Sequence, residues 1–143
     1  QQPIPGQKGG GPLKDASCKA FQQTADEYLI RHRSILDVLS KFQESSARVN
    51  RAVAKAVTSC GCLKIQASRQ PITPNMTLSE FRQLVSSHLQ GSLCESCREV
   101  IINEIGANLF YQAALCSLLG LELEEVLEKE MQRINAFGIF NLS

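Results

Sequence analysis

The most apolar stretch of the chain, residues 105–119, is interrupted chiefly by three polar residues: Asn108, Gln112 and Ser117. A helix that is apolar on almost all sides has to be surrounded by other elements. Ser92 with Glu95 matches a capping box, and Gly120 is a typical helix stop. The pattern therefore predicts a central helix from about residue 93 to Gly120, with other helices packed around it.

The N-terminal part, residues 15–59, contains no glycine or proline, and its apolar residues recur at alternating intervals of four and three: Phe21, Ala25, Tyr28, Ile35, Leu39, Phe42, Val49, Val53 and Ala56. This spacing predicts one long helix, or two helices broken near Ser34, which forms a Ser-x-x-Asp cap pattern with Asp37. The polar residues His32 and Ser46 interrupt this row of apolar residues, which we call the N-terminal seam. We interpret His32 as a packed or partly exposed residue rather than a ligand.

The remaining segments are shorter. Residues 63–76 contain two prolines and read as an extended connection. Thr77 with Glu80 predicts a capped short helix that Gly91 ends, and residues 122–135 predict a last helix with an acidic start. The tail, residues 136–143, is expected to pack back on the bundle.

These elements predict an all-α fold, a bundle of about four helices with one long N-terminal helix. Residues 1–14 are rich in Gly, Pro and Gln, a composition that predicts a disordered N-terminal segment. Residues 15–143 predict a single helical domain, since 143 residues with 43% hydrophobic content suffice for one core. The long N-terminal seam is more than one short helix can cover, so we expect a homodimer or higher homo-oligomer.

Charge and hydropathy restrict the partners. The formal net charge is +1, without the clustered basic charge that nucleic acid or an acidic membrane surface requires. No apolar run is long enough to span a bilayer, and residues 1–15 lack the hydrophobic centre of a signal peptide. The sequence predicts a cytoplasmic protein that binds neither nucleic acid nor membranes.

Four of the six cysteines form two tight pairs, Cys60-x-Cys62 and Cys94-x-x-Cys97. Short Cys spacings let one backbone turn present two thiolates to a tetrahedral zinc ion. The pairs fall at the end of one predicted helix and the start of another, so we predict a structural zinc site that joins two helix ends. A redox disulfide switch, an iron–sulfur cluster and unrelated buried thiols are the alternatives. Cys116 is predicted to lie in the core, and Cys18 has no evident partner.

A polar stripe runs along the central helix, because Glu104, Asn108 and Gln112 stand at i, i+4 and i+8. It is either a solvent-facing line or a polar groove that faces the first long helix and could hold a ligand or metal.

Two motifs resemble a known family. Residues 103–134, NEIGANLFYQAALCSLLGLELEEVLEKEMQRI, look like the second half of the MazG-like all-α nucleotide pyrophosphohydrolases, and residues 43–53, QESSARVNRAV, look like their first motif. The resemblance implies a MazG-like helical bundle that assembles through helices. It also implies a Mg²⁺ site built from two carboxylate pairs that binds substrate phosphates and assists attack by water.

The residues present do not complete that site. Glu44 and Glu104 remain as catalytic candidates, but Ser45, Arg48 and Ala107 stand where the family has carboxylates. Arg48 is instead predicted to pair with Glu104, because a guanidinium has donors and no acceptors.

We therefore expect a catalytically inactive, zinc-binding MazG-like protein with a binding or regulatory role. The alternatives are a diverged pyrophosphohydrolase, using Mg²⁺ and a nucleotide ligand, and a thiol redox sensor.

Overall fold

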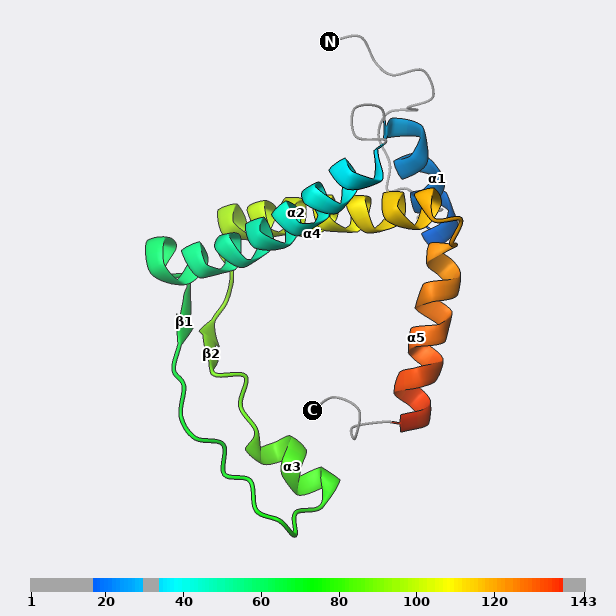
Figure 1. Ribbon diagram of the computed structural model, residues 1–143. Helices are drawn as coiled ribbons and strands as arrows, with labels where there is room; N and C mark the ends of the chain where they lie inside the picture. The colour runs from blue at the N-terminus through cyan, green and yellow to red at the C-terminus, as the bar shows by residue number, and fades with distance from the viewer. Residues whose placement is uncertain (1–16, 30–33, 138–143) are drawn as a thin grey trace. The chain divides into compact units, whose positions relative to one another are not determined.

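The computed structural model describes residues 17–29 and 34–137, and this part of the chain is predominantly helical (Figure 1). Its α-helices are α1 (Cys18–Tyr28), α2 (Ile35–Lys55), α3 (Leu78–Leu84), α4 (Glu95–Leu118) and α5 (Leu123–Phe137). A π-helical turn, Ala56–Cys60, continues α2, and two short strands, β1 (Leu63–Ile65) and β2 (Leu89–Gly91), form the single sheet of the described residues. The predicted all-α class is confirmed.

The N-terminal seam forms two helices rather than one. Ser17 caps α1 by accepting a hydrogen bond from the Ala20 N–H at 3.1 Å, and α1 ends at Tyr28. The second helix starts at Ile35, and the Ser34 carbonyl accepts a bond from the Val38 N–H at 3.0 Å. The predicted break near Ser34 is therefore present. The predictions for His32, for the disordered N-terminal segment of residues 1–14 and for the tail beyond Phe137 lie outside the described residues.

The described residues form two compact units. The terminal unit comprises the described residues up to Val38 and from Phe110 onward, and the central unit is Leu39–Leu109. In the terminal unit, Leu29, Val38 and Ala114 form a buried apolar cluster. Three partly buried residues pack against this cluster: Phe110, Leu115 and Leu118.

One glutamine fixes the start of α5 to α1 in the terminal unit. The Gln22 Nε2 donates to the Leu121 carbonyl at 2.8 Å and to the Ser117 Oγ at 3.2 Å. The Gln22 Oε1 accepts from the Leu123 N–H at 2.8 Å. The first N–H groups of a helix have no partner inside it, so this contact satisfies one of them.

The central unit joins the end of α2 to the start of α4. Ala56 from the π-helical turn, Leu63 from β1 and Ile101 from α4 are buried together. Five partly buried residues pack against them: Ala52, Val57, Cys62, Leu93 and Cys97. Two of these are members of the predicted zinc site, so the site is built on a packed apolar cluster.

Residues 63–93, which we call the arm, leave and re-enter the central unit between the two cysteine pairs. At its base, β1 and β2 pair antiparallel, with Lys64 opposite Gln90. The predicted Thr77–Glu80 capping box is present, and both of its hydrogen bonds measure 3.2 Å. The expected extended connection of residues 63–76 begins with β1, whose pairing with β2 the sequence did not predict.

The helix of the arm is shorter than predicted. It ends at Leu84 rather than at Gly91, and residues 89–91 form β2. The Gln70 side chain donates to the Ser86 carbonyl at 2.8 Å and accepts from its N–H at 3.1 Å. Gln70 thus binds both the N–H and the carbonyl of Ser86, and these groups are no longer available for the hydrogen bonds of a continuing helix.

The remaining helix boundaries differ from the prediction by one or two residues. The central helix begins at Glu95, so Cys94 precedes its first turn, and it ends at Leu118, while α5 extends to Phe137. In the described ranges no helix combines the length and hydropathy needed to cross a membrane.

Candidate metal centre

Cys60 and Cys62 are placed by a tight turn at the end of α2. Cys60 is the last residue of the π-helical turn, and Gly61 adopts a left-handed conformation with φ of 79°. The Gly61 N–H donates to the Ala56 carbonyl at 3.0 Å, which closes the turn. Glycine adopts this conformation without a steric cost, so Cys-Gly-Cys can reverse direction and present both thiols on the same side.

Cys94 and Cys97 are placed by the start of α4. The Cys97 N–H donates to the Cys94 Sγ at 3.4 Å, so the sulfur takes the capping role that the sequence assigned to Ser92. The Cys94 carbonyl accepts from the Arg98 N–H at 2.9 Å. Cys94 therefore caps α4 and Cys97 lies in its first turn, which brings both thiols of the second pair to the start of the helix.

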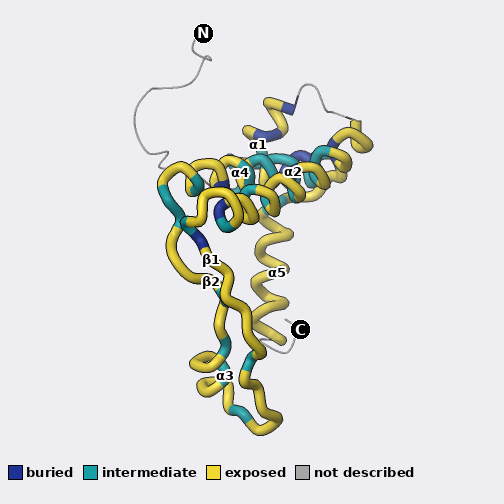
Figure 2. Tube along the Cα trace, turned by 90° about the vertical axis from the view of Figure 1, so that its left-hand side faces the viewer, coloured by how far each residue is buried: buried dark blue, intermediate teal, exposed yellow. Residues whose placement is uncertain are grey.

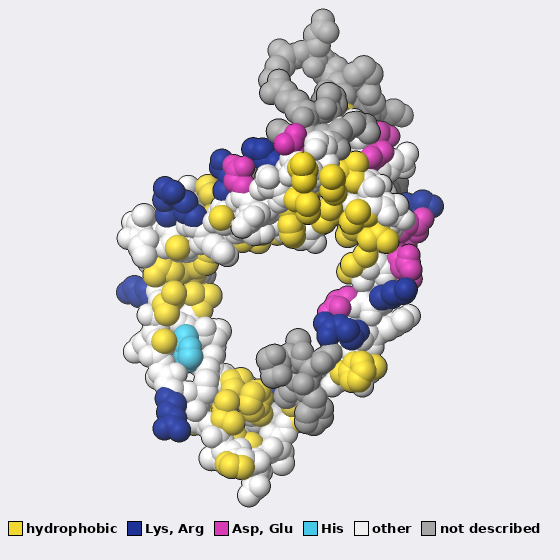
Figure 3. Space-filling view, in the orientation of Figure 1, with side chains coloured by type: hydrophobic (Ala, Val, Ile, Leu, Met, Phe, Trp, Pro, Cys, Tyr) yellow, Lys and Arg dark blue, Asp and Glu magenta, His cyan; other side chains and the backbone are white. Residues whose placement is uncertain are grey.

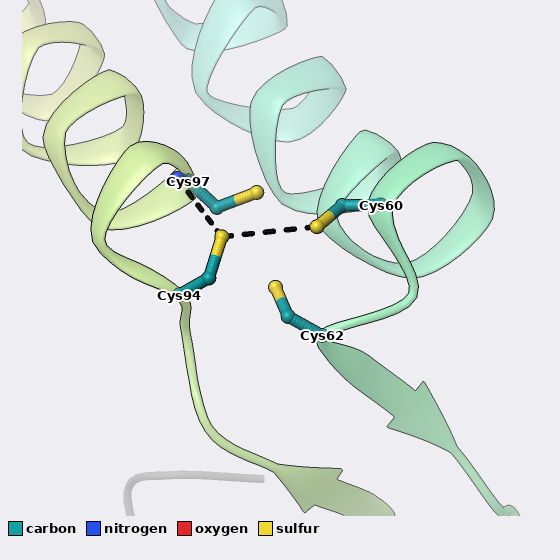
Figure 4. A group of neighbouring side chains, drawn as sticks. All are labelled: Cys60, Cys62, Cys94 and Cys97. Carbon is teal, nitrogen blue, oxygen red and sulfur yellow. Dashed lines mark hydrogen bonds between the residues drawn. The ribbon is translucent and has the colours of Figure 1, made fainter.

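The structure brings the four predicted ligands together. The Sγ atoms of Cys60, Cys62, Cys94 and Cys97 all lie within 4.8 Å of one another, and in Figure 4 they point toward a common centre. Cys60 Sγ and Cys94 Sγ, which belong to different pairs, are 3.7 Å apart. We call these four residues the cysteine cluster.

The spacing fits tetrahedral zinc. Four sulfurs at about 2.3 Å from a central ion lie about 3.8 Å from one another when they occupy the corners of a tetrahedron. The 3.7 Å separation of Cys60 Sγ and Cys94 Sγ already has this value. The cluster could hold a metal ion such as zinc after small movements of the other side chains.

The thiols influence one another's ionisation. The backbone N–H of Cys97 stabilises negative charge on the Cys94 sulfur, and with bonds from Cys97 and Cys60 thiols it lowers the pKa of Cys94 to about 7. The hydrogen bond from Cys97 to Cys94 raises the pKa of Cys97 to about 12, with a smaller contribution from desolvation. Cys94 thus ionises at a lower pH than Cys97, and metal binding releases the protons that the ligating thiols still carry.

The other two cysteines do not join the cluster. Cys18 lies on α1 and Cys116 near the end of α4, and both are partly buried free thiols. Desolvation raises the pKa of Cys116, as expected for a thiol in apolar surroundings.

No second metal-binding group forms from the carboxylates of the described residues. Glu44 is exposed on α2, where it pairs with Lys41 at 3.0 Å and with Arg48 at 3.3 Å. The bond from Lys41, followed by that from Arg48, lowers the pKa of Glu44. Arg48 therefore pairs with Glu44 on its own helix rather than with Glu104, which is half-buried on α4.

The middle of the polar stripe faces α2. The Asn108 Nδ2 donates to the Ser45 Oγ and to the Ser46 Oγ, each at 3.0 Å. Ser45 is only 3% exposed, and its hydroxyl also donates to the Phe42 carbonyl at 2.7 Å. Neutral hydroxyl and amide groups thus connect α2 and α4 at this contact.

A small open pocket lies beside this contact. Its volume is about 250 Å³, and it is lined by Ser46, Val49, Asn50, Ile105 and Asn108. Glu44 and Glu104 are not among these residues. Gln112, at the other end of the stripe, is half-buried in the terminal unit.

Comparisons with protein-family models, with curated proteins and with solved structures give no match. The function has to be argued from the site itself.

Sequence reasoning missed the role of Gly91 at the base of the arm. This residue has φ of +84°, and a Cβ atom there would lie 2.4 Å from the Cys62 carbonyl oxygen. The glycine thus lets β2 approach the backbone of a predicted ligand. The sequence showed that Gly91 suits the end of a helix, but it did not show that this residue lies in a strand paired with β1.

Proposed function

We propose that this protein is a zinc-binding helical protein in which the cysteine cluster holds one structural zinc ion. The observation that carries the proposal is the convergence of four sulfurs, from two segments 34 residues apart, to within 4.8 Å of one another. Zinc at this position would join the end of α2 to the start of α4 and close the base of the arm.

The donor set supports a structural role. Four protein ligands fill the coordination shell of tetrahedral zinc, whereas catalytic zinc keeps one position open for water or substrate. The metal would contribute folding free energy, because ligands from distant segments do not meet in the unfolded chain.

We further propose that the helices derive from a MazG-like scaffold whose Mg²⁺ site has been lost, which leaves a binding or regulatory role. Two features support the loss. Glu44 is engaged by two cations, and Ser45, which stands at one of the family's carboxylate positions, forms a neutral contact with Asn108 on the other helix. Mg²⁺ requires several oxygen ligands around one ion, which these residues do not supply.

Metal analysis tests the zinc proposal. The protein purified under reducing conditions should contain about one zinc per chain, and Cys60→Ser or Cys97→Ser should lose most of it. Cys18→Ser is the matched control, because it removes a partly buried thiol outside the cluster and should leave the zinc content unchanged. Metal-free protein whose cluster forms a reversible disulfide would support the redox sensor instead, and a brown, iron-containing protein would indicate an iron–sulfur cluster.

A nucleotide assay tests the loss of catalysis. Incubation of the protein with nucleoside triphosphates and Mg²⁺ or Mn²⁺ should release no pyrophosphate above background. Turnover that disappears in both Glu44→Gln and Glu104→Gln would contradict the proposal and restore the pyrophosphohydrolase.

A further inference from the structure

The arm carries a short amphipathic helix, α3, that no other described element buries. No residue of α3 is buried, and Leu78 and Leu84 are 45% and 49% exposed. Figures 2 and 3 show the exposed tube of α3 and the hydrophobic side chains gathered on it. A helix of seven residues is too short to be stable alone in water. Its apolar side therefore requires a surface to cover it.

A second element has the same property. No residue of α5 is buried, although the helix carries an apolar stripe whose exposed members are Val126, Leu127, Met131, Ile134 and Phe137. Met131 is 56% exposed and Phe137 is 60% exposed. Among the described residues, Gln22 holds the start of α5 through its bond to the Leu123 N–H. Most of the stripe is left uncovered in the described chain.

The two elements carry opposite charge. The arm, residues 63–93, has three basic residues and one glutamate, a net charge of +2, and residues 122–137 have five glutamates and two basic residues, a net charge of −3. In α5, Lys129 pairs with Glu125 and Arg133 pairs with Glu130. Among the described residues this leaves Glu122, Glu124 and Glu128 without an ion pair.

The basic side chains of the arm are likewise available. Lys64, Arg69 and Arg82 are exposed and form no ion pair within the described ranges. Glu80, the one acidic residue of the arm, is engaged in the capping box of α3. Two α5 helices would repel each other, whereas the arm offers an apolar surface with the complementary sign of charge.

We propose that the apolar face of α5 docks on the arm of a second copy of this chain, and that two copies exchange this contact reciprocally. The result is a closed twofold dimer in which each arm covers the α5 helix of the other copy. Basic residues of the arm then face the unpaired glutamates of α5, around a contact formed by the two apolar stripes.

A second exposed surface favours a second copy over the chain's own arm. In the central unit, α4 carries an apolar stripe of Ile102, Ile105 and Leu109, which are 51%, 44% and 43% exposed. A contact between α5 and the arm alone buries none of this stripe. A second α4 running antiparallel covers it, so two copies bury apolar residues of α4 as well as those of α5 and the arm.

Two charge-reversed variants of the full chain test the docking. One carries Arg69→Glu with Arg82→Glu in the arm, and the other carries Glu124→Lys with Glu128→Lys on α5. In sedimentation at micromolar concentration, the unmodified protein should show the mass of two chains. Each variant alone should show half that mass, because like charges then face each other across both contacts.

Mixing provides the decisive measurement. An equimolar mixture should return to the mass of two chains. The acidic arm of one variant then meets the basic α5 of the other, and the unmodified α5 of the first meets the unmodified arm of the second.

A control variant changes charge elsewhere. Arg51→Glu with Lys55→Glu on α2 changes the net charge by the same amount as the arm variant and should remain dimeric. Circular dichroism verifies that the variants are helical, and the milder Arg82→Gln and Glu128→Gln should also weaken the dimer if a reversed chain unfolds.

A monomeric unmodified protein, charge-reversed variants that remain dimers, or a mixture that stays monomeric would each overturn the proposal. Docking on the chain's own arm predicts this last result, because mixing two chains cannot restore an internal contact.

Discussion

Asn108 joins two helices through a neutral hydrogen-bonded contact. Its amide bridges the hydroxyls of Ser45 and Ser46, and Ser45 is buried. Buried polar groups need partners because an unpaired group keeps its full desolvation cost. Asn108 therefore holds α2 and α4 together through hydrogen bonds in the central unit, where the sequence left open whether it faces solvent.

Asn108→Ala should lower the free energy of unfolding by about 1 to 2 kcal/mol, because the buried Ser45 hydroxyl loses its donor. Urea unfolding of the zinc-loaded protein measures the change. Asn103→Ala is the control, since Asn103 is exposed on the same helix and the replacement gains the same helix propensity. Equal stabilities of the two variants would mean that the interhelical bonds contribute nothing.

At the scale of elements, the antiparallel strands bring the two cysteine pairs together. β1 directly follows Cys62 and β2 ends at Gly91, three residues before Cys94. Their register places Leu63 opposite Gly91, so strand pairing and the cysteine cluster form at the same place. The approach of Gly91 to the Cys62 carbonyl limits that position to glycine.

Gly91→Ala should destabilise the protein more than Gly61→Ala and should weaken zinc binding. Both glycines have positive φ, so each replacement costs about 1 to 2 kcal/mol from the left-handed backbone. Only at position 91 does the new Cβ meet another backbone atom, and such overpacking adds about 1 to 3 kcal/mol. Thermal unfolding and competition with a zinc-binding dye compare the two, and equal effects would show that the close approach is unimportant.

At the scale of the whole molecule, the described chain has two units with separate means of stabilisation. The terminal unit contains the cluster around Leu29 and Ala114 and the Gln22 contacts. The central unit has the small cluster around Ala56 and Ile101, next to four thiols. Because the central unit contains all four thiols, a metal bound by them would stabilise that unit first.

Chelation of zinc should lower the thermal midpoint and open the central unit first. A ligand present at 100 times its Kd stabilises the native state by about 2.7 kcal/mol, which corresponds to a shift on the order of 10 °C for a chain of this size. Hydrogen exchange should accelerate in residues 56–65 and 89–101 more than in residues 18–28. The Cys60→Ser variant, already depleted of zinc, should not respond to the chelator, and uniform acceleration would argue against a local role of the metal.

Local signals account for what the sequence predicted well. The helical seams and the Thr77–Glu80 box depend on residue period and on neighbours within four positions. The end of α3 was less exact, because the side chain of Gln70, 16 residues away, binds the backbone of Ser86. The start of α4 was shifted by a local contact, in which the Cys94 sulfur caps the helix in place of Ser92.

The sequence by itself determined the helical class, the break between α1 and α2 as one of two alternatives, and the four thiols with their paired spacing. Only the tertiary structure decided that Cys60 Sγ and Cys94 Sγ meet at 3.7 Å, that the arm begins and ends in paired strands, and that Asn108 faces Ser45. The physical reason is that these contacts close loops of tens of residues. Their free energy depends on which apolar surfaces pack together, and no local pattern records that choice.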